Sequence, residues 1–168
     1  MFMTHYMELL AHNQPWNLIF FMVIPVVLAE TVAITELFVL FSRPSGGALV
    51  QVNRWASIAG GTYFVGVFAY LVSNAVIPLT ASGGWRGAAD VLAVGFYLAG
   101  VVPLVGMALL DMGWIGRGLA AANRLKLHAG FVAGFLVVAH VAMIFGMLDP
   151  SLLGARQDGV VIEHAVHR

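Results

Sequence analysis

Apolar and polar positions along this chain fall into long blocks. Four blocks, at residues 16–41, 55–79, 88–110 and 125–148, are almost continuously apolar. A helix needs about 20 mostly apolar residues to cross the roughly 30 Å of hydrocarbon in a bilayer. Each block is apolar around its whole circumference and lacks the water-facing side of a helix in a soluble protein. The pattern therefore predicts four transmembrane helices.

The connections between the blocks are short and contain many Gly, Pro and Ser residues, at positions 42–47, 80–86 and 111–118. Such clusters are typical of turns between elements. Connections of this length place consecutive helices side by side. We therefore predict an all-α integral membrane protein that folds as a four-transmembrane-helix up-down-up-down bundle. This single transmembrane domain covers residues 1–168, including an N-terminal segment, 1–15, and a C-terminal tail, 149–168.

Composition supports a lipid environment. Apolar residues make up 61% of the chain and charged residues 10%, whereas soluble domains carry about 25% charged residues. The 8 basic and 8 acidic side chains cancel, so the chain has no basic surface of the kind that binds nucleic acid. Cysteine is absent, which excludes disulfides, thiolate nucleophiles and Cys-ligated metals.

Interfacial residues predict the boundaries and the orientation. Trp16, Trp55, Trp85 and Trp114 lie near predicted helix ends, as expected of an aromatic belt. Lys and Arg are enriched in the connections on the cytoplasmic side of a membrane. The first and third connections contain five such residues, Arg43, Arg54, Arg117, Arg124 and Lys126, and the opposite side contains three, Arg86, Arg156 and Arg168. We expect the bacterial inner membrane with both termini outside, and the reversed topology stays open as the alternative.

Ionisable residues inside the predicted spans are the strongest functional signal, because each costs on the order of 3 kcal/mol at a helix centre. The first span contains Glu30 and Glu36, and the fourth contains His128 and His140. At about 1.5 Å per residue, antiparallel spans would place Glu36 level with His128 and allow Glu30 to approach His140. Asp90 and Asp111 lie at the ends of the third span, where we expect water or headgroups to reach them.

The leading functional hypothesis is that the bundle interior binds or conducts a cation or proton, with Glu30, Glu36 and His140 as candidate metal ligands or proton carriers. The structural alternative is that these side chains only join helices through hydrogen bonds. The short connections leave little room for a soluble catalytic domain, so we expect no enzymatic activity. The fourth span also contains Gly130 and Gly134, a small-xxx-small pattern that we expect to serve packing within the bundle, with self-association of the chain as the alternative.

Four histidines occupy the terminal segments: His5, His12, His164 and His167. Imidazole suits copper, zinc, nickel and iron. Their spacing matches no specific closed site, however, and a metal site also needs an ordered outer shell. We expect solvated histidines there.

The stretch 124–140, with histidines near its two ends, resembles one helix of the ferric-reductase-like or b-type cytochrome membrane families. The resemblance implies haem b bound through His128 and His140, and electron transfer. A separation of 12 residues turns the second histidine about 120° from the first. The second and third spans contain no histidine, so a further axial ligand would come from another chain, a terminal histidine or Met107.

Three hypotheses therefore stay open. The first is a protein that binds or conducts a cation or proton, and the second is a b-type haem subunit for electron transfer. The third is an accessory subunit of a larger membrane complex, without chemistry of its own. The expected partners are the lipid bilayer and either further copies of the chain or other membrane subunits, and the cofactor is open between none, a transition-metal ion and haem b.

Overall fold

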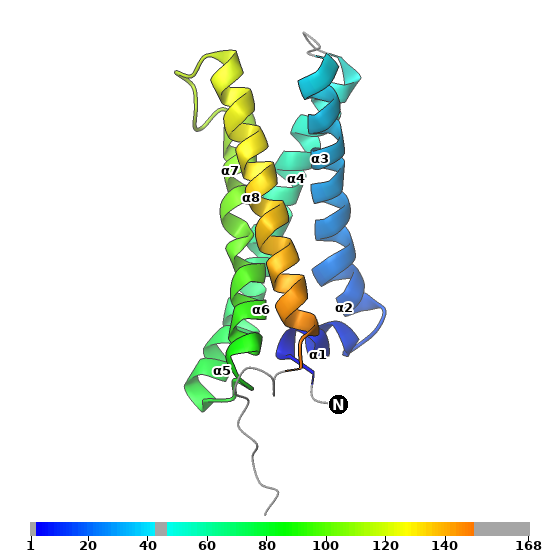
Figure 1. Cartoon of the computed structure of the whole chain (residues 1–168), viewed down its shortest axis with the longest axis vertical. Helices are drawn as coiled ribbons and strands as arrows, with labels where there is room; N and C mark the ends of the chain where they lie inside the picture. The colour runs from blue at the N-terminus through cyan, green and yellow to red at the C-terminus, as the bar shows by residue number, and fades with distance from the viewer. Residues whose placement is uncertain (1–2, 43–46, 150–168) are drawn as a thin grey trace, which may run out of the picture.

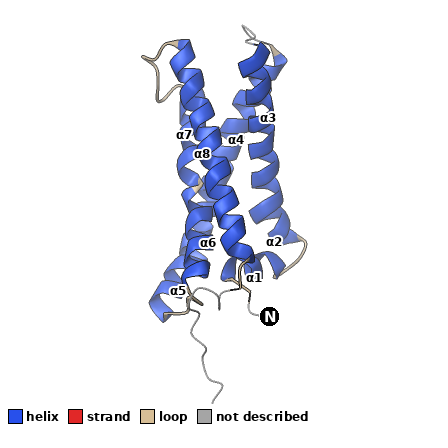
Figure 2. Cartoon of the chain, in the orientation of Figure 1, coloured by secondary structure: helices blue, strands red, loops and turns tan. Residues whose placement is uncertain are grey.

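The computed structural model describes residues 3–42 and 47–149, and these residues form helices joined by short loops (Figures 1 and 2). In chain order the elements are α1 (His5–Ala11), α2 (Trp16–Leu18), η1 (Ile19–Val23), α3 (Ile24–Ser42), α4 (Ala48–Leu71), η2 (Val72–Val76), α5 (Ile77–Ser82), α6 (Ala88–Ala99), α7 (Val101–Asp111) and α8 (Ala121–Met147). The two η elements are π-helical turns within longer helices.

These elements join into four helices that are long and apolar enough to cross a membrane: Trp16–Ser42, Ala48–Ser82, Ala88–Asp111 and Ala121–Met147. The second begins at Ala48 and the fourth at Ala121, each earlier than the predicted starts at 55 and 125. Hydropathy detects only the apolar part of a helix. Polar residues interrupt the apolar pattern in the first two turns of both helices, Asn53 and Arg54 in α4 and Arg124 in α8. Trp55 consequently lies inside α4.

Pro25 and two tyrosines explain the π-helical turn at the start of the first long helix. Proline has no amide hydrogen, so the carbonyl groups four or five residues earlier lose their donor. The Tyr97 hydroxyl donates to the carbonyl of Phe21 at 2.5 Å, and the Tyr63 hydroxyl donates to that of Phe20 at 3.0 Å. Side chains of neighbouring helices thus satisfy the backbone groups that the proline frees.

The long helices pack around one apolar centre. α4 lies against α3 and α7, and α8 lies against α6 and α7. The central cluster consists of Ala29, Val32, Phe64, Leu104, Met107, Val132 and Phe135. Large apolar side chains also cover the outside of the long helices, among them Phe41, Val102 and Ile144. An apolar exterior on helices of this length suggests a lipid environment.

Glycine permits close helix contact at positions other than the predicted ones. A Cβ atom on Gly61 of α4 would lie 2.5 Å from the Cβ of Ala108 in α7, and one on Gly106 would lie 2.7 Å from the Phe131 ring. Around Gly130 and Gly134 the described part of the chain leaves open space. The expectation that this pair packs within the bundle is therefore wrong, because its face of α8 points away from the neighbouring helices.

The N-terminal segment contains the short helix α1, which lies across one end of the long helices (Figure 1). Its cap residue Thr4 accepts a hydrogen bond from the amide of Met7 and donates one at 2.9 Å to the carbonyl of Gly146 in α8. Leu10 is buried in a second apolar cluster with Phe21 and Leu98. The segment is therefore attached to the bundle on both its polar and apolar sides.

Candidate functional site: a buried carboxylate–histidine cluster

Three ionisable side chains meet near the end of the bundle where α7 leads into α8. Glu36 of α3, Asp111 of α7 and His128 of α8 come from three different long helices. Glu36 and His128 are both buried, with 3% and 4% of their surface exposed. Ionised side chains are costly to place in an apolar interior unless they have a partner.

The ring of His128 lies between the two carboxylates. Its Nε2 is 3.1 Å from Oδ2 of Asp111 and its Nδ1 is 3.0 Å from Oε2 of Glu36. A neutral imidazole has one N–H donor, whereas the protonated ring has two. An imidazolium can therefore serve both carboxylates, and a neutral ring can donate to one of them only.

The two sides of the ring are not equivalent. The Asp111 side forms an aligned hydrogen bond. On the other side, Nδ1 lies within ion-pair distance of Glu36 Oε2, but the two atoms are not aligned for a hydrogen bond. The second oxygen of Glu36, Oε1, has no hydrogen-bond partner among the residues described. Buried polar atoms normally have partners, so these two atoms leave hydrogen-bonding capacity that an exchangeable proton can use.

Polar residues of α4 complete the cluster. The side-chain amide of Asn53 donates to Glu36 Oε2 at 3.2 Å and to the hydroxyl of Thr35 at 2.9 Å. The hydroxyl of Ser57, one turn further along α4, donates to Asp111 Oδ2. Sequence reasoning missed Asn53 and Ser57. Their spacing of four residues, which places them on one helix face, is the signal that could have found them.

A polar pocket of about 390 Å³ leads from the surface to this cluster. Asp111, a member of the cluster, and Asn53, which donates to Glu36, both line this pocket. Arg54 and Arg124 line the pocket as well, and Arg124 donates to the carbonyl of Leu110 at 2.5 Å. The expectation of access to Asp111 agrees with this pocket. On the other side of Glu36 lies the apolar central cluster with Val32.

The other predicted site residues do not join the cluster. Glu30 lies on the exposed surface of α3, and the described residues show no ion pair between it and His140. His140 is exposed on α8, where its Nδ1 lies 2.6 Å from the carbonyl of Leu136. The predicted proximity of Glu36 and His128 is thus confirmed, whereas Glu30 and His140 stand apart from it.

A second acid–histidine contact lies at the other end of the α6–α7 helix, where none was expected. Asp90 is completely buried rather than reached by water. It accepts from the backbone amide of His5 at 2.6 Å, and its other oxygen lies 2.5 Å from His5 Nδ1. The expectation of a solvated His5 is therefore wrong, because the capped helix α1 brings it onto Asp90. His164 and His167 lie outside the described residues.

Metal-ligating side chains do not converge in the described part of the chain, where no group of three or more His, Asp or Glu residues is arranged to hold a metal ion. In the cluster itself, Glu36 and Asp111 contact opposite nitrogens of the His128 ring. Their oxygens therefore lie on different sides of the ring and do not converge on a common point where a metal ion could bind.

The fold and this site define a class: an all-helical protein with four potential membrane-spanning helices and a carboxylate–histidine cluster in its interior. The chain belongs to the family of unknown function DUF6803, whose family model matches residues 1–161. No curated protein and no solved structure matches the chain. The family match includes both acid–histidine sites.

Proposed function

We propose that this chain is a polytopic membrane protein whose bundle interior binds an exchangeable proton at Glu36, His128 and Asp111. The observation that carries the proposal is the buried His128 ring, which has a carboxylate oxygen within 3.1 Å of each nitrogen. Histidine is the side chain whose ordinary pKa lies closest to physiological pH. A histidine shared by two carboxylates can hold one proton in several arrangements and release it to water.

Membrane insertion is part of the proposal. The four long helices would cross the bilayer in an up-down-up-down bundle, since helices with apolar exteriors of this length match its hydrocarbon thickness. Arg54, Arg117, Arg124 and Lys126 belong to the connections and helix ends near the polar pocket. The enrichment of Lys and Arg on the cytoplasmic side favours a bacterial inner membrane with this pocket inside and the termini outside.

Several contacts favour a proton over a metal ion or haem. Both nitrogens of His128 face carboxylates, so an iron or other metal could bind this ring only if a carboxylate moved away. The exposed His140 is about 18 Å from His128 along the helix at 1.5 Å per residue. A proton needs no rearrangement of these side chains.

The surroundings of the cluster favour binding from one side over conduction across the bundle. Water can reach Asp111 through the polar pocket, and His128 connects Asp111 to Glu36. Beyond Glu36 the interior consists of the central apolar cluster, in which Val32 and Phe64 are each 1% exposed. A proton path through that region would need polar side chains or ordered water.

Proton counting tests this function. The protein in lipid nanodiscs is titrated between pH 5 and 9, and bound protons are compared for the unmodified protein, Glu36→Gln and the matched control Glu30→Gln on the same helix. We expect Glu36→Gln to change the titration curve by about one proton per chain or to move its midpoint, because it removes a carboxylate beside His128. Glu30→Gln should leave the contribution of the cluster unchanged. Identical curves for the unmodified protein and Glu36→Gln would contradict the proposal.

Flux measurements separate binding from conduction. In liposomes with an imposed proton gradient, we expect proton entry at the rate of protein-free liposomes. A faster proton entry that is lost in Glu36→Gln and kept in Glu30→Gln would contradict one-sided binding. It would show that the protein conducts protons.

Glu30 supports a second candidate function, that of a subunit in a larger assembly. It is an exposed acid near the middle of a potential span, and an ionisable group there normally faces a partner or an aqueous cavity. Another membrane subunit or a second copy could supply that partner. Purification in mild detergent tests this: Glu30→Gln should lose a subunit that the unmodified protein retains, whereas a monomer in both samples would contradict it.

A further inference from the structure

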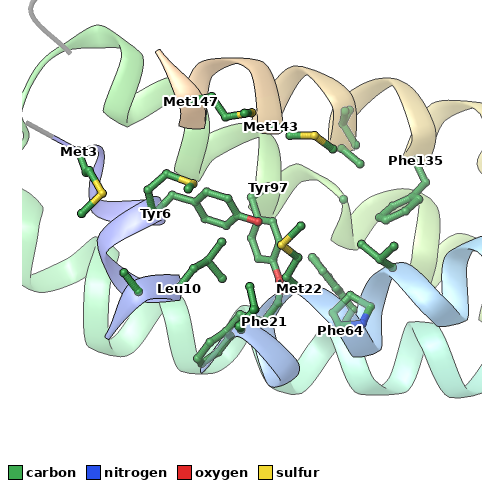
Figure 3. A pocket seen from close by; sticks show the side chains of 18 of the residues that line it. Met3, Tyr6, Leu10, Phe21, Met22, Phe64, Tyr97, Phe135, Met143 and Met147 are labelled. Carbon is green, nitrogen blue, oxygen red and sulfur yellow. The ribbon is translucent and has the colours of Figure 1, made fainter. Parts of the chain in front are cut away.

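An apolar cavity lies at the end of the bundle opposite the carboxylate–histidine cluster. Its volume is about 440 Å³, within the range of about 300 to 1,000 Å³ typical of small-molecule sites. Figure 3 shows Tyr6 and Leu10 of α1 on one side, Phe21 and Met22 on another, and Met143 and Met147 of α8 opposite them. α1 therefore closes the end of the cavity, while the first and last long helices form its walls.

The rim of the cavity lies on the outer surface of the long helices. Met22 and Val26 on the first long helix and Met143 on α8 line the cavity and are exposed. Val26 follows Trp16 by about 15 Å along the helix axis at 1.5 Å per residue. In a membrane, an opening with this composition and depth faces acyl chains rather than water. Methionine is flexible and suits sites that accommodate chains of variable shape.

The Tyr6 hydroxyl is a hydrogen-bond donor that faces this apolar space without a partner among the described residues. The Tyr6 hydroxyl makes no hydrogen bond to the described residues, whereas the neighbouring Tyr97 hydroxyl donates to the carbonyl of Phe21. Figure 3 shows the Tyr6 hydroxyl directed towards Tyr97 inside the cavity. Burial raises the pKa of Tyr6 to about 12, so its hydroxyl remains a donor at neutral pH. The cavity thus offers the Tyr6 donor to a largely apolar ligand.

The closed end of the cavity is held in place. α1 is attached through His5 to the buried Asp90, through Thr4 to the carbonyl of Gly146, and through Glu8 to Arg86 at 2.5 Å. These contacts fix Tyr6 and Leu10 in a defined position beside the spans. A binding site with a fixed end loses less conformational entropy on binding than a mobile one.

From these observations we propose that the cavity binds one acyl chain of a membrane phospholipid. The chain enters between the first long helix and α8, and a carbonyl oxygen of the lipid ester accepts from Tyr6. Tyr6 belongs to the helix at the end of the bundle, which is the level at which ester groups lie in a bilayer. The acyl chain then extends past Met22 and Val26 towards Phe135. This inference rests on the proposed membrane insertion and is independent of the proton site.

Photolabelling tests the site with a matched pair of variants. The protein is placed in phosphatidylcholine and phosphatidylglycerol vesicles that contain phosphatidylcholine with a diazirine in its acyl chain, and labelled residues are mapped by mass spectrometry. Val26→Trp fills the cavity, whereas Val27→Trp changes the neighbouring valine, which is more exposed (53% against 37%) and lies outside its lining. We expect Val26→Trp to lower labelling of Met143 and Phe135 about tenfold, because the indole occupies the space of the chain. Val27→Trp should match the unmodified protein.

A second variant tests the hydrogen bond. Tyr6→Phe keeps the ring and removes the donor, so the phospholipid retained per chain after detergent purification should fall about two- to tenfold. Glu36→Gln should retain as much lipid as the unmodified protein. Equal labelling of Met143 in Val26→Trp and Val27→Trp, or retention of a quinone in place of phospholipid, would overturn the inference. An absence of label on all four long helices would instead refute the proposed membrane insertion.

Discussion

The two acid–histidine sites of the described chain lie at opposite ends of the α6–α7 helix and are built differently. At one end, His128 lies between two carboxylates from separate helices, and a polar pocket reaches one of them. At the other end, His5 contacts one carboxylate, Asp90, through both its ring and its backbone amide. The first arrangement leaves a buried carboxylate oxygen without a hydrogen-bond partner in the described region, and the second uses both oxygens of Asp90.

This difference separates a site for chemistry from a site for attachment. A carboxylate whose two oxygens both have donors, one of them a backbone amide, holds a segment in position. A buried carboxylate that shares a histidine and retains unused hydrogen-bonding capacity can change its protonation state. The proton site that we propose therefore lies at the Glu36 end, and we expect the Asp90 end to anchor α1.

The largest expected effect comes from removing the shared histidine. His128→Ala leaves Glu36 and Asp111 without their common partner in a buried site, and breaking such an interaction costs about 3 to 5 kcal/mol. The free energy of unfolding in detergent and urea should fall by this amount. His140→Ala, on the same helix but exposed, serves as the control and should change it by about 0.5 kcal/mol or less. If both variants lose the same free energy of unfolding, His128 has no larger structural role than His140 and the prediction is wrong.

The next largest effect concerns the close packing of α4 against α7. A Cβ on Gly61 would contact both Ala108 and the backbone carbonyl of Leu104 at 2.5 and 2.6 Å. Gly61→Ala should therefore cost about 1 to 3 kcal/mol, as overpacking does in other cores. Gly134→Ala meets open space and should leave the unfolding free energy unchanged. A larger loss in Gly134→Ala would show that its face is covered by another helix.

A smaller and local effect is expected at the anchoring end. Asp90→Asn weakens the attachment of His5, and hydrogen exchange should increase in α1 while the long helices keep their protection. Tyr6 reports the same event, because burial raises its pKa to about 12. In a released α1 that pKa should return to about 10. An unchanged absorbance titration of Tyr6 in Asp90→Asn would contradict the anchoring role.

The sign of the pH dependence follows from that shift. Docked Tyr6 has a higher pKa than free Tyr6, so docking of α1 is fully favourable below about pH 10 and weakens as pH rises towards 12. Protection of α1 from hydrogen exchange should decline over this interval. Tyr6→Phe should remove this contribution to the decline.

The sequence predicted the long helices well, because each contains an apolar block of the length that crosses a bilayer, which can be recognised from hydropathy alone. It also placed Glu36 level with His128, since helical rise and alternating direction determine depth. The starts at Ala48 and Ala121 were missed, because polar helical turns carry no hydropathy signal. The outward position of Glu30 was not foreseen, since depth along a helix does not determine which way a side chain faces.

The contact between His5 and Asp90 was inaccessible to the same reasoning. It joins residues 85 positions apart in the sequence, and its helix α1 has only 7 residues, too few for a periodic pattern to be informative. The cavity beside Tyr6 likewise arises from the docking of this helix, so no single segment predicts it.

Nitrogen NMR of His128 in lipid bilayers tests the central claim most directly. With ¹⁵N-labelled histidine and the signals assigned through His128→Gln, Glu36→Gln should shift mainly the Nδ1 resonance and Asp111→Asn mainly the Nε2 resonance, because each carboxylate faces a different nitrogen. Glu30→Gln should shift neither. If both resonances stay unchanged in Glu36→Gln and Asp111→Asn, His128 is not shared between the two carboxylates and the proposed proton site is wrong.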